Sequence, residues 1–258
     1  MSDLSTNHLL RHELAKTERF NAPQRLLKFG WKAHSQNEED GMLAEIFRRI
    51  GTQQKRFIEF GVGNGTECNT LALLLQGWRG AWMDGSAQSV AAARGLHHGM
   101  ADKLEIVECV VTAENVDRKL SSLGLSDELD LLSIDTDFND YWLWNAIVSA
   151  RPRVVVIEYN ATYPPPISIT VAYEPTRTWD TSSYFGASLS ALAKLGREKG
   201  YSLVGCCLSG INAFFVRDDL VADKFHGPFT AEEHYEPPRY WLALPSGHRP
   251  GVGPWCEV

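Results

Sequence analysis

The chain has 258 residues, 44% of them hydrophobic, and a formal net charge of −7. This length suits one α/β domain with additions, or two small domains, and allows a substantial core. The acidic balance argues against a nucleic-acid surface, and no apolar run approaches the roughly 18 residues needed to cross a bilayer. The polar N-terminus is unlike a secretory signal, and the cysteines lack paired metal spacing, so we expect a reduced, cytoplasmic protein.

Residues 1–50 are expected to form an N-terminal helical cap. Ser35 and Glu38 have the spacing of a capping box, in which the serine caps a helix and the glutamate reaches back to it. The apolar residues that follow recur at helical spacing. The helix is expected to stop at Gly51, because glycine readily takes the left-handed conformation after a helix.

Short apolar runs then alternate with helical stretches. We expect strands at 56–60, 80–83, 104–111, 129–134 and 153–157, and helices at 70–76, 86–94, 116–123, 141–150 and 186–199. Two final runs, 201–206 and 212–216, are joined through Ser209-Gly210 and predict a hairpin, so the last strand is antiparallel. The predicted fold class is α/β: a Rossmann-like, seven-stranded, mostly parallel sheet with helices on both faces.

The segment 57–66 reads FIEFGVGNGT, an apolar run followed by glycines at alternate positions. Such a pattern predicts a strand, a tight turn and a helix, a common cradle for a nucleotide-like cofactor. A complete dinucleotide fingerprint would place glycine where Thr66 stands. Glu59 would repel a pyrophosphate but attract an ammonium and a sulfonium. The pattern therefore indicates S-adenosylmethionine (SAM), with a dinucleotide oxidoreductase as a distant alternative.

Several motifs together resemble the FkbM-like branch of class I SAM-dependent methyltransferases. They are SQNEED at 35–40, EFGVGNG at 59–65, NT at 69–70, GWRG at 77–80, SID at 133–135, NDY at 139–141, EYN at 158–160 and GINAFFVR at 210–217. The resemblance implies SAM as the methyl donor and a hydroxyl acceptor on a sugar or natural product. The chain departs from similar sequences at Phe138, where glycine is expected, which puts the shape of that turn in question.

The resemblance also implies roles in cofactor binding. Gly61 and Gly63 would lie under the methionine moiety, with Gly65 in the same loop and Glu59 near the ammonium. Asp84, at the end of the next strand, has the position of an acid that accepts both ribose hydroxyls. The adenine would lie near Val111, Thr112 and Glu114, and the pattern does not choose between them. Gln36 could close over the methionine end, and Asp135 could contact the ammonium or sulfonium side.

Acids at two strand ends are the candidates for the chemistry. Asp135 and Asp137 follow the strand 129–134, and Glu158 and Asn160 follow the strand 153–157. In one interpretation Asp137 or Glu158 takes the proton of the acceptor hydroxyl. In another, all four side chains bind Mg²⁺ or another divalent cation, which prefers oxygen ligands. In a third, the acids only cap helices and brace loops, as Asp140 would at a helix start.

The remaining expectations concern the segments that cover the acceptor and the molecules that the protein binds. Residues 51–220 form the core, with a long insert at 161–185 that is expected to cover the acceptor, and 221–258 form an aromatic and proline-rich tail. We expect His226 and His234 in the tail to be solvated surface residues and not catalytic bases. The favoured function is O-methylation of a small-molecule acceptor, without nucleic acid or membrane. N- or C-methylation, a non-catalytic SAM-binding protein and a homodimer remain open.

Overall fold

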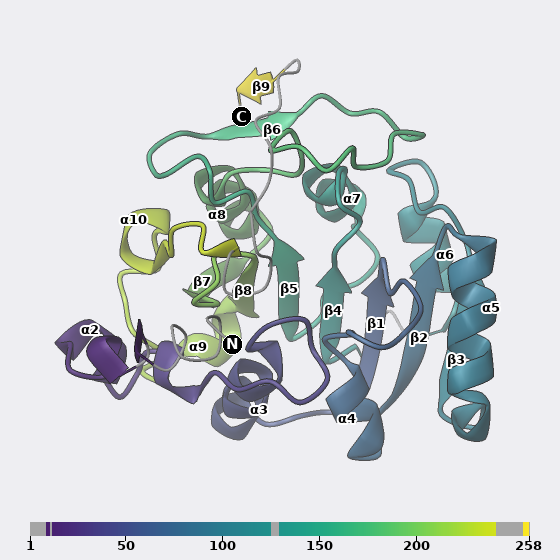
Figure 1. The fold of residues 1–258 in the computed structure, drawn as a ribbon, viewed down its shortest axis with the longest axis horizontal. Helices are drawn as coiled ribbons and strands as arrows, with labels where there is room; N and C mark the ends of the chain where they lie inside the picture. Colours follow the sequence, from purple (N-terminus) through teal and green to yellow (C-terminus); the bar gives the residue numbers. More distant parts are fainter. Residues whose placement is uncertain (1–8, 11, 125–128, 241–254, 258) are drawn as a thin grey trace.

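The computed structural model describes residues 9–10, 12–124, 129–240 and 255–257. Seven strands form the main sheet in the order β3-β2-β1-β4-β5-β8-β7 (Figure 1). Their bounds are β1 (Arg56–Phe60), β2 (Arg79–Asp84), β3 (Leu104–Glu108), β4 (Leu131–Ile134), β5 (Val154–Glu158), β7 (Tyr201–Cys206) and β8 (Asn212–Arg217). All neighbouring pairs are parallel except those of β8, which runs antiparallel to β5 and to β7. The predicted fold class is therefore confirmed.

Helices lie on both faces of this sheet. They are α2 (Glu18–Asn21), α3 (Glu39–Ile50), α4 (Leu71–Leu75), α5 (Ala87–Leu96), α6 (Val116–Ser122), α7 (Asp140–Ala146), α8 (Leu189–Glu198), α9 (Asp218–Val221) and α10 (Ala231–His234), with short 3₁₀ turns η1 (Leu27–Phe29) and η2 (His98–Met100). One buried cluster joins α6, α7 and α8 to the sheet. A second joins α3 and α4 to the opposite side chains of the same strands. This two-sided burial explains why the central strands are nearly continuous apolar runs.

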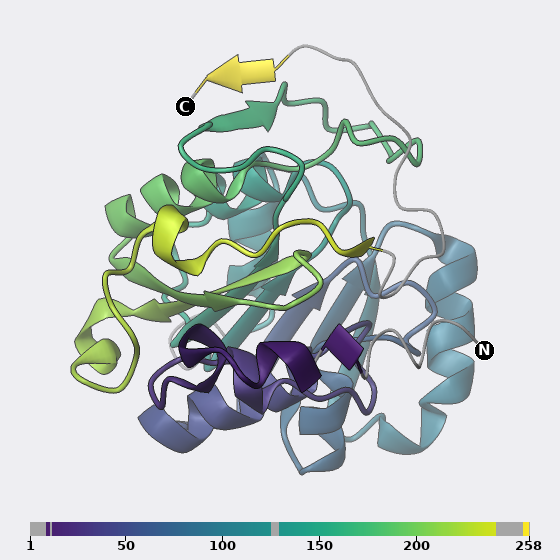
Figure 2. The ribbon, with the colours of Figure 1, turned by 60° about the vertical axis from the view of Figure 1, so that its left-hand side comes forward.

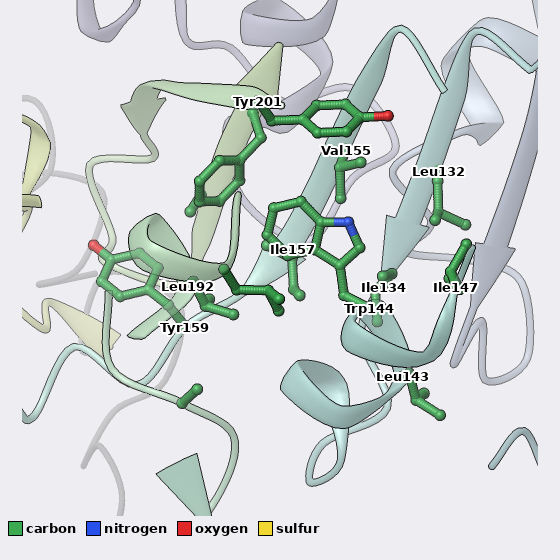
Figure 3. Close-up of a cluster of buried hydrophobic side chains, with 14 of the residues drawn as sticks. Leu132, Ile134, Leu143, Trp144, Ile147, Val155, Ile157, Tyr159, Leu192 and Tyr201 are labelled. Carbon is green, nitrogen blue, oxygen red and sulfur yellow. The ribbon is translucent and has the colours of Figure 1, made fainter. Parts of the chain in front are cut away.

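Trp144 of α7 is the largest side chain in the first cluster. Its ring is 2% exposed and lies 4.8 Å from the ring of Phe215 and 6.0 Å from that of Tyr201. Figure 3 shows this tryptophan between the strands β4 and β5 and the side chains of α8. Gly196 of α8 lets the helix approach, because a Cβ there would lie 2.8 Å from the Phe215 ring.

The start of α3 differs from the capping-box prediction. The helix begins at Glu39 and not directly after Ser35. Asp40 reaches back instead, and its Oδ2 accepts the backbone N–H groups of Ala33, His34 and Ser35. The Ser35 hydroxyl oxygen accepts the N–H of Asp40 in return, at 3.2 Å. The prediction was wrong because the loop before the helix folds back onto it. The end at Gly51, with φ of +72°, is as expected.

The insert contains a strand that the sequence did not reveal. Strand β6 (Ile169–Val171) pairs antiparallel with β9 (Trp255–Glu257) from the tail. In Figure 1 these strands lie beyond the carboxyl ends of β4 and β5, and Figure 2 shows them side by side outside the main sheet. The insert and the tail, far apart in sequence, are thus held together. Within the described part of the chain, no helix has the length and apolarity that a membrane span requires.

Candidate functional site

A cavity of about 500 Å³ lies at the carboxyl ends of the parallel strands. Its walls come from the residues that end or follow β1, β2, β3 and β4, and from the insert between Pro175 and Trp179. This volume falls within the roughly 300–1,000 Å³ of pockets that bind small molecules and cofactors. The position is the one at which parallel α/β sheets bind their ligands.

The glycine loop after β1 forms the floor of this cavity. Gly61 has φ of +74°, and a Cβ there would lie 1.5 Å from the backbone oxygen of Asp135. Gly63 has φ of +53°, and a Cβ there would meet nothing within 4 Å. Gly61 therefore allows two strand ends to approach, and Gly63 leaves space for a ligand. Gly65 packs toward Trp82 and His97, is absent from the cavity lining, and shapes the turn.

Asp84 projects into the cavity from the end of β2. Its Oδ2 accepts the N–H of Gly63 and its Oδ1 accepts the N–H of Ser86, each at 2.8 Å. The carboxylate is thereby fixed in place. Each oxygen has a further lone pair that a ligand hydroxyl could use. The geometry suits the ribose role predicted for Asp84, which stays a prediction.

Glu59 lies beneath the loop and does not line the cavity. Its Oε1 accepts the N–H of Asn69 at 2.7 Å, and its Oε2 accepts the N–H and the hydroxyl of Thr70. Trp82 donates its indole N–H to that same hydroxyl. Burial raises the pKa of Glu59 to about 7. The carboxyl group therefore ties β1 to the start of α4, a role that the sequence did not predict, and its contact with an ammonium stays a prediction.

Three other residues of the predicted cofactor set, Gln36, Thr112 and Asp135, lie outside the cavity lining, and Asp135 is described below with the acids. Gln36 is exposed on the loop before α3, where its backbone oxygen accepts a hydrogen bond from Lys32. Thr112 begins the turn into α6, and its N–H donates to Asn115. The wall after β3 is formed by residues 109–111 instead. Cys109 is half-buried and lines the cavity, because β3 ends one residue before it.

Three of the predicted acids converge where β4 and β5 end. Carboxylate oxygens of Asp135, Asp137 and Glu158 all lie within 4.8 Å of one another. Burial and repulsion from neighbouring carboxylates raise the pKa of Asp135 and of Glu158 above the ordinary range. Glu158 Oε2 is buried and has no hydrogen-bond partner among the described residues. The arrangement, which we call the acid trio, is therefore suited to hold a cation or a proton.

Asn160, the fourth predicted ligand, has another role. Its Nδ2 donates to the backbone oxygens of Ser183 at 2.8 Å and Phe185 at 2.9 Å. Its Oδ1 accepts the N–H of Thr162 at 3.1 Å. These bonds tie the two ends of the insert together, and a role of Asn160 as a metal ligand stays a prediction. Asp140 is also engaged, because its Oδ1 accepts the N–H of Thr136 within the turn after β4.

The insert is held across the cavity by side chains from the β4 turn and α7. Asn139 exchanges two hydrogen bonds with the backbone of Glu174, and Trp142 donates to the backbone oxygen of Val171. Phe138 is 1% exposed, and its ring packs against that of Tyr184 with centroids 5.6 Å apart. The unexpected Phe138 thus supports the insert, and Asp137 takes the left-handed conformation of the turn, with φ of +64°.

The far end of the insert reaches the loop after β3. Tyr173 donates its hydroxyl to Glu114 at 2.6 Å and accepts the N–H of Ala113 at 3.0 Å. The insert therefore crosses from the β5 side of the sheet to the β3 side. It forms one wall of the cavity above the glycine loop, whereas the sequence placed it over the acceptor alone.

The two tail histidines lie away from this cavity. His234 is 3% exposed, and burial lowers its pKa to about 3. His226 lies beside it, with Nε2 3.1 Å from Glu233 Oε1. The expectation of a solvated surface residue was wrong for His234, because α10 packs against α8 and β7.

No family model matches the chain, and no curated protein matches it. Among solved structures it is similar to the mitomycin 7-O-methyltransferase MmcR, at 19% identity over 69% of this chain and 55% of that one, with a TM-score of 0.41. It is also similar to the CurJ carbon methyltransferase, at 10% identity over 69% and 52%, with a TM-score of 0.43. The chain spans about half the length of these two proteins.

A further similar structure is a SAM-dependent methyltransferase from Geobacter sulfurreducens in complex with S-adenosyl-L-homocysteine. The identity is 16% over 67% of this chain and 68% of that one, with a TM-score of 0.37.

Proposed function

We propose that the protein is a SAM-dependent methyltransferase of the FkbM-like kind, which methylates a hydroxyl group of a small molecule such as a sugar or secondary metabolite. The observation that carries the proposal is the pairing of two features in one place. Asp84 is fixed over an open glycine loop, and the acid trio lies at the adjoining strand ends. The first suits a nucleoside donor and the second suits removal of a proton from an alcohol.

The charge of the cavity favours SAM over a dinucleotide. Its lining includes the carboxylates Asp84 and Asp137, and Arg177 is the single cation among the described lining residues. A pyrophosphate would be repelled by such a wall, whereas a sulfonium and an ammonium would be attracted. Gly61 and Gly63 would lie beneath the donor, Asp84 would bind the ribose, and residues 109–111 would face the base. When bound, SAM supplies an electrophilic methyl group.

The acid trio also fits a divalent cation. Three carboxylates within 4.8 Å of one another suit the oxygen preference of Mg²⁺, and Glu158 Oε2, which has no hydrogen-bond partner among the described residues, would supply a ligand atom. A metal held there would lower the pKa of a bound acceptor hydroxyl. Without a metal, burial and the neighbouring carboxylates raise the pKa of Glu158, so this group would be a stronger base toward that proton than an exposed carboxylate. In both cases the acid trio would hold the acceptor hydroxyl beside the donor.

Calorimetric titration with SAM, S-adenosylhomocysteine and NAD tests the donor. We expect both SAM and its product to bind, and NAD not to bind. Asp84→Asn should weaken SAM binding about tenfold or more, because it removes a charged acceptor of ribose hydroxyls. Asp102→Asn, an exposed aspartate before β3, is the matched control. Equal affinity of the Asp84 variant and the wild type would refute the ribose assignment, and binding of NAD alone would refute the function.

Formation of S-adenosylhomocysteine with a panel of hydroxylated acceptors tests catalysis. Turnover of an alcohol would support O-methylation, and methylated amine or carbon products would redirect the proposal to N- or C-methylation. If the metal participates, EDTA should abolish turnover and Mg²⁺ should restore it. Full activity in EDTA would leave the three acids as proton acceptors only.

A further inference from the structure

The cavity carries one positive side chain in a mainly acidic surrounding. Among its described lining residues, Arg177 is the only cation, and it projects from the insert. The whole chain has a net charge of −7, and the nearby acid trio adds further negative charge. The sulfonium and the ammonium of SAM have no need of a guanidinium in this wall. The charge of Arg177 therefore calls for an anionic partner, which is either the carboxylate of the donor or an anionic group of the acceptor.

The guanidinium is held in place by aromatic rings. Its central carbon lies 5.2 Å from the centroid of Phe138 and 5.4 Å from that of Tyr184, and both rings are buried. Arginine stacks well on aromatic faces because its charge is spread over a plane. Stacking of this kind leaves the N–H groups at the edge of the plane available for a ligand. The supporting rings thus orient Arg177 without satisfying its donors.

Two acidic neighbours form loose ion pairs with Arg177 but accept no hydrogen bond from it. Glu174 Oε2 lies 3.8 Å from one guanidinium nitrogen, and Asp180 Oδ2 lies 4.0 Å from another. Both distances exceed those of hydrogen bonds. In the part of the chain that the structure describes, the side chain of Arg177 donates no hydrogen bond, and it is 34% exposed. The group is positioned and only partly hydrated.

The location of Arg177 points to the acceptor side of the site. Its platform, Phe138, directly follows Asp137 of the acid trio. The donor groups that suit a ribose and a base, Asp84 and residues 109–111, belong to the β2 and β3 side of the same cavity. A molecule with a hydroxyl at the acid trio would therefore present its other substituents toward Arg177.

We propose that Arg177 binds an oxyanion of the methyl acceptor, so that the acceptor is a hydroxylated acid carrying a carboxylate or a phosphate. The inference rests on the proposed function and narrows its substrate class. A planar guanidinium matches both kinds of oxyanion with two parallel hydrogen bonds. Arg177 would select acids over neutral alcohols of the same shape, and the acid trio would hold the hydroxyl that reacts.

The test compares acceptors that differ only in the anionic group. Glucose, glucuronate and glucose 6-phosphate form one set, and catechol and 3,4-dihydroxybenzoate form another. Each is titrated into the full chain saturated with S-adenosylhomocysteine, in EDTA so that a metal does not bind the anion. We expect at least one acid to bind about tenfold or more tighter than its neutral counterpart. The carboxylate and the phosphate then report which oxyanion is preferred.

The variants assign that preference to one residue. Arg177→Gln should remove the preference for the acid and leave binding of the neutral counterpart unchanged. Arg177→Lys should keep part of it, because the charge remains but the paired geometry is lost. Arg118→Gln, an exposed arginine on α6, should have no effect. Equal binding of acids and neutral molecules in both sets, or a preference that survives in Arg177→Gln, would overturn the inference.

A second pair of ligands tests whether Arg177 binds the acceptor or the donor. S-adenosylhomocysteine carries a carboxylate, and methylthioadenosine lacks the whole amino acid. If Arg177→Gln weakened the binding of S-adenosylhomocysteine but not that of methylthioadenosine, Arg177 would bind the donor carboxylate and the inference would be wrong. Equal donor binding in wild type and variant supports it. Failure of the wild type to bind S-adenosylhomocysteine at all would instead refute the proposed function.

Discussion

Replacing Glu59 with glutamine tests whether this carboxyl group braces the glycine loop. One of its oxygens accepts the N–H of Asn69, and the other accepts both the N–H and the hydroxyl of Thr70. A glutamine offers only one oxygen, so its amide nitrogen must face a backbone N–H. A protonated glutamate avoids this conflict, because its hydroxyl oxygen still accepts the N–H of Thr70. One buried donor left without a partner should lower the free energy of unfolding by about 1–3 kcal/mol.

The contribution of Glu59 to the free energy of unfolding depends on pH and decreases as the pH rises. Burial raises the pKa of Glu59 from 4.5 in the unfolded chain to about 7 in the folded one. Its contribution to stability is fully present below about pH 4.5 and is lost as the pH rises through about 7, because the unfolded chain releases its proton first. The loss is roughly 3 kcal/mol in all, of which about 2 kcal/mol falls between about pH 5.5 and about pH 8. Glutamine does not titrate.

Urea unfolding at these two pH values measures both effects. Between about pH 5.5 and about pH 8 the free energy of unfolding of Glu59→Gln should rise by about 2 kcal/mol relative to the wild type, so that a variant that is less stable at acid pH equals or exceeds the wild type by about pH 8. Glu67→Gln, an exposed residue of the same loop that pairs with Lys32 at 3.3 Å, should change stability by less than about 1 kcal/mol at either pH. A difference in stability that stays constant, or a variant that becomes less stable relative to the wild type as the pH rises, would refute the assignment of Glu59.

Three further changes follow from the packing and the acid trio. Trp144→Ala should lower the free energy of unfolding by about 3–5 kcal/mol, measured by urea unfolding, because its ring is 2% exposed in the core. Phe138→Ala should weaken SAM binding about tenfold in calorimetry if loosening the insert costs about 1.4 kcal/mol of binding free energy; an unchanged affinity would contradict its role in supporting that wall. Asp137→Asn should abolish any rise in melting temperature that Mg²⁺ gives the wild type, and an equal rise in both would remove Asp137 from the ligand set.

The elements of the main sheet were predictable because their signals are local. Apolar runs bounded by glycine and aspartate marked all seven strands within a few residues, and the strand ends at Asp84 and Glu158 agree with the sequence pattern. The alternation of strands and helices then made parallel pairing the expected arrangement. The short β6 and β9 carried no such signal, because each is three residues long and pairs only with the other.

The sequence predicted which residues gather at the site, but not which of their polar atoms are already hydrogen-bonded within the protein. The sequence placed the glycine loop and Asp84 beside acids at two strand ends, since neighbouring parallel strands end at the same edge. It did not show that hydrogen bonds occupy Glu59 and Asn160, because their partners are loop N–H and carbonyl groups that only the turns bring near. It also did not show Cys109 at the cavity or the stacking of Arg177 on Phe138.

The sequence by itself determined the fold class, the glycine loop and which strand ends carry carboxylates. These features follow from hydrophobic periodicity and from backbone conformations that only certain residues allow. Only the tertiary structure decided which of those polar groups face the cavity, and that the insert forms one of its walls. Such choices depend on contacts between residues far apart in sequence, as between Asn139 and Glu174 or between Tyr173 and Glu114, and a burial pattern along the chain does not record them.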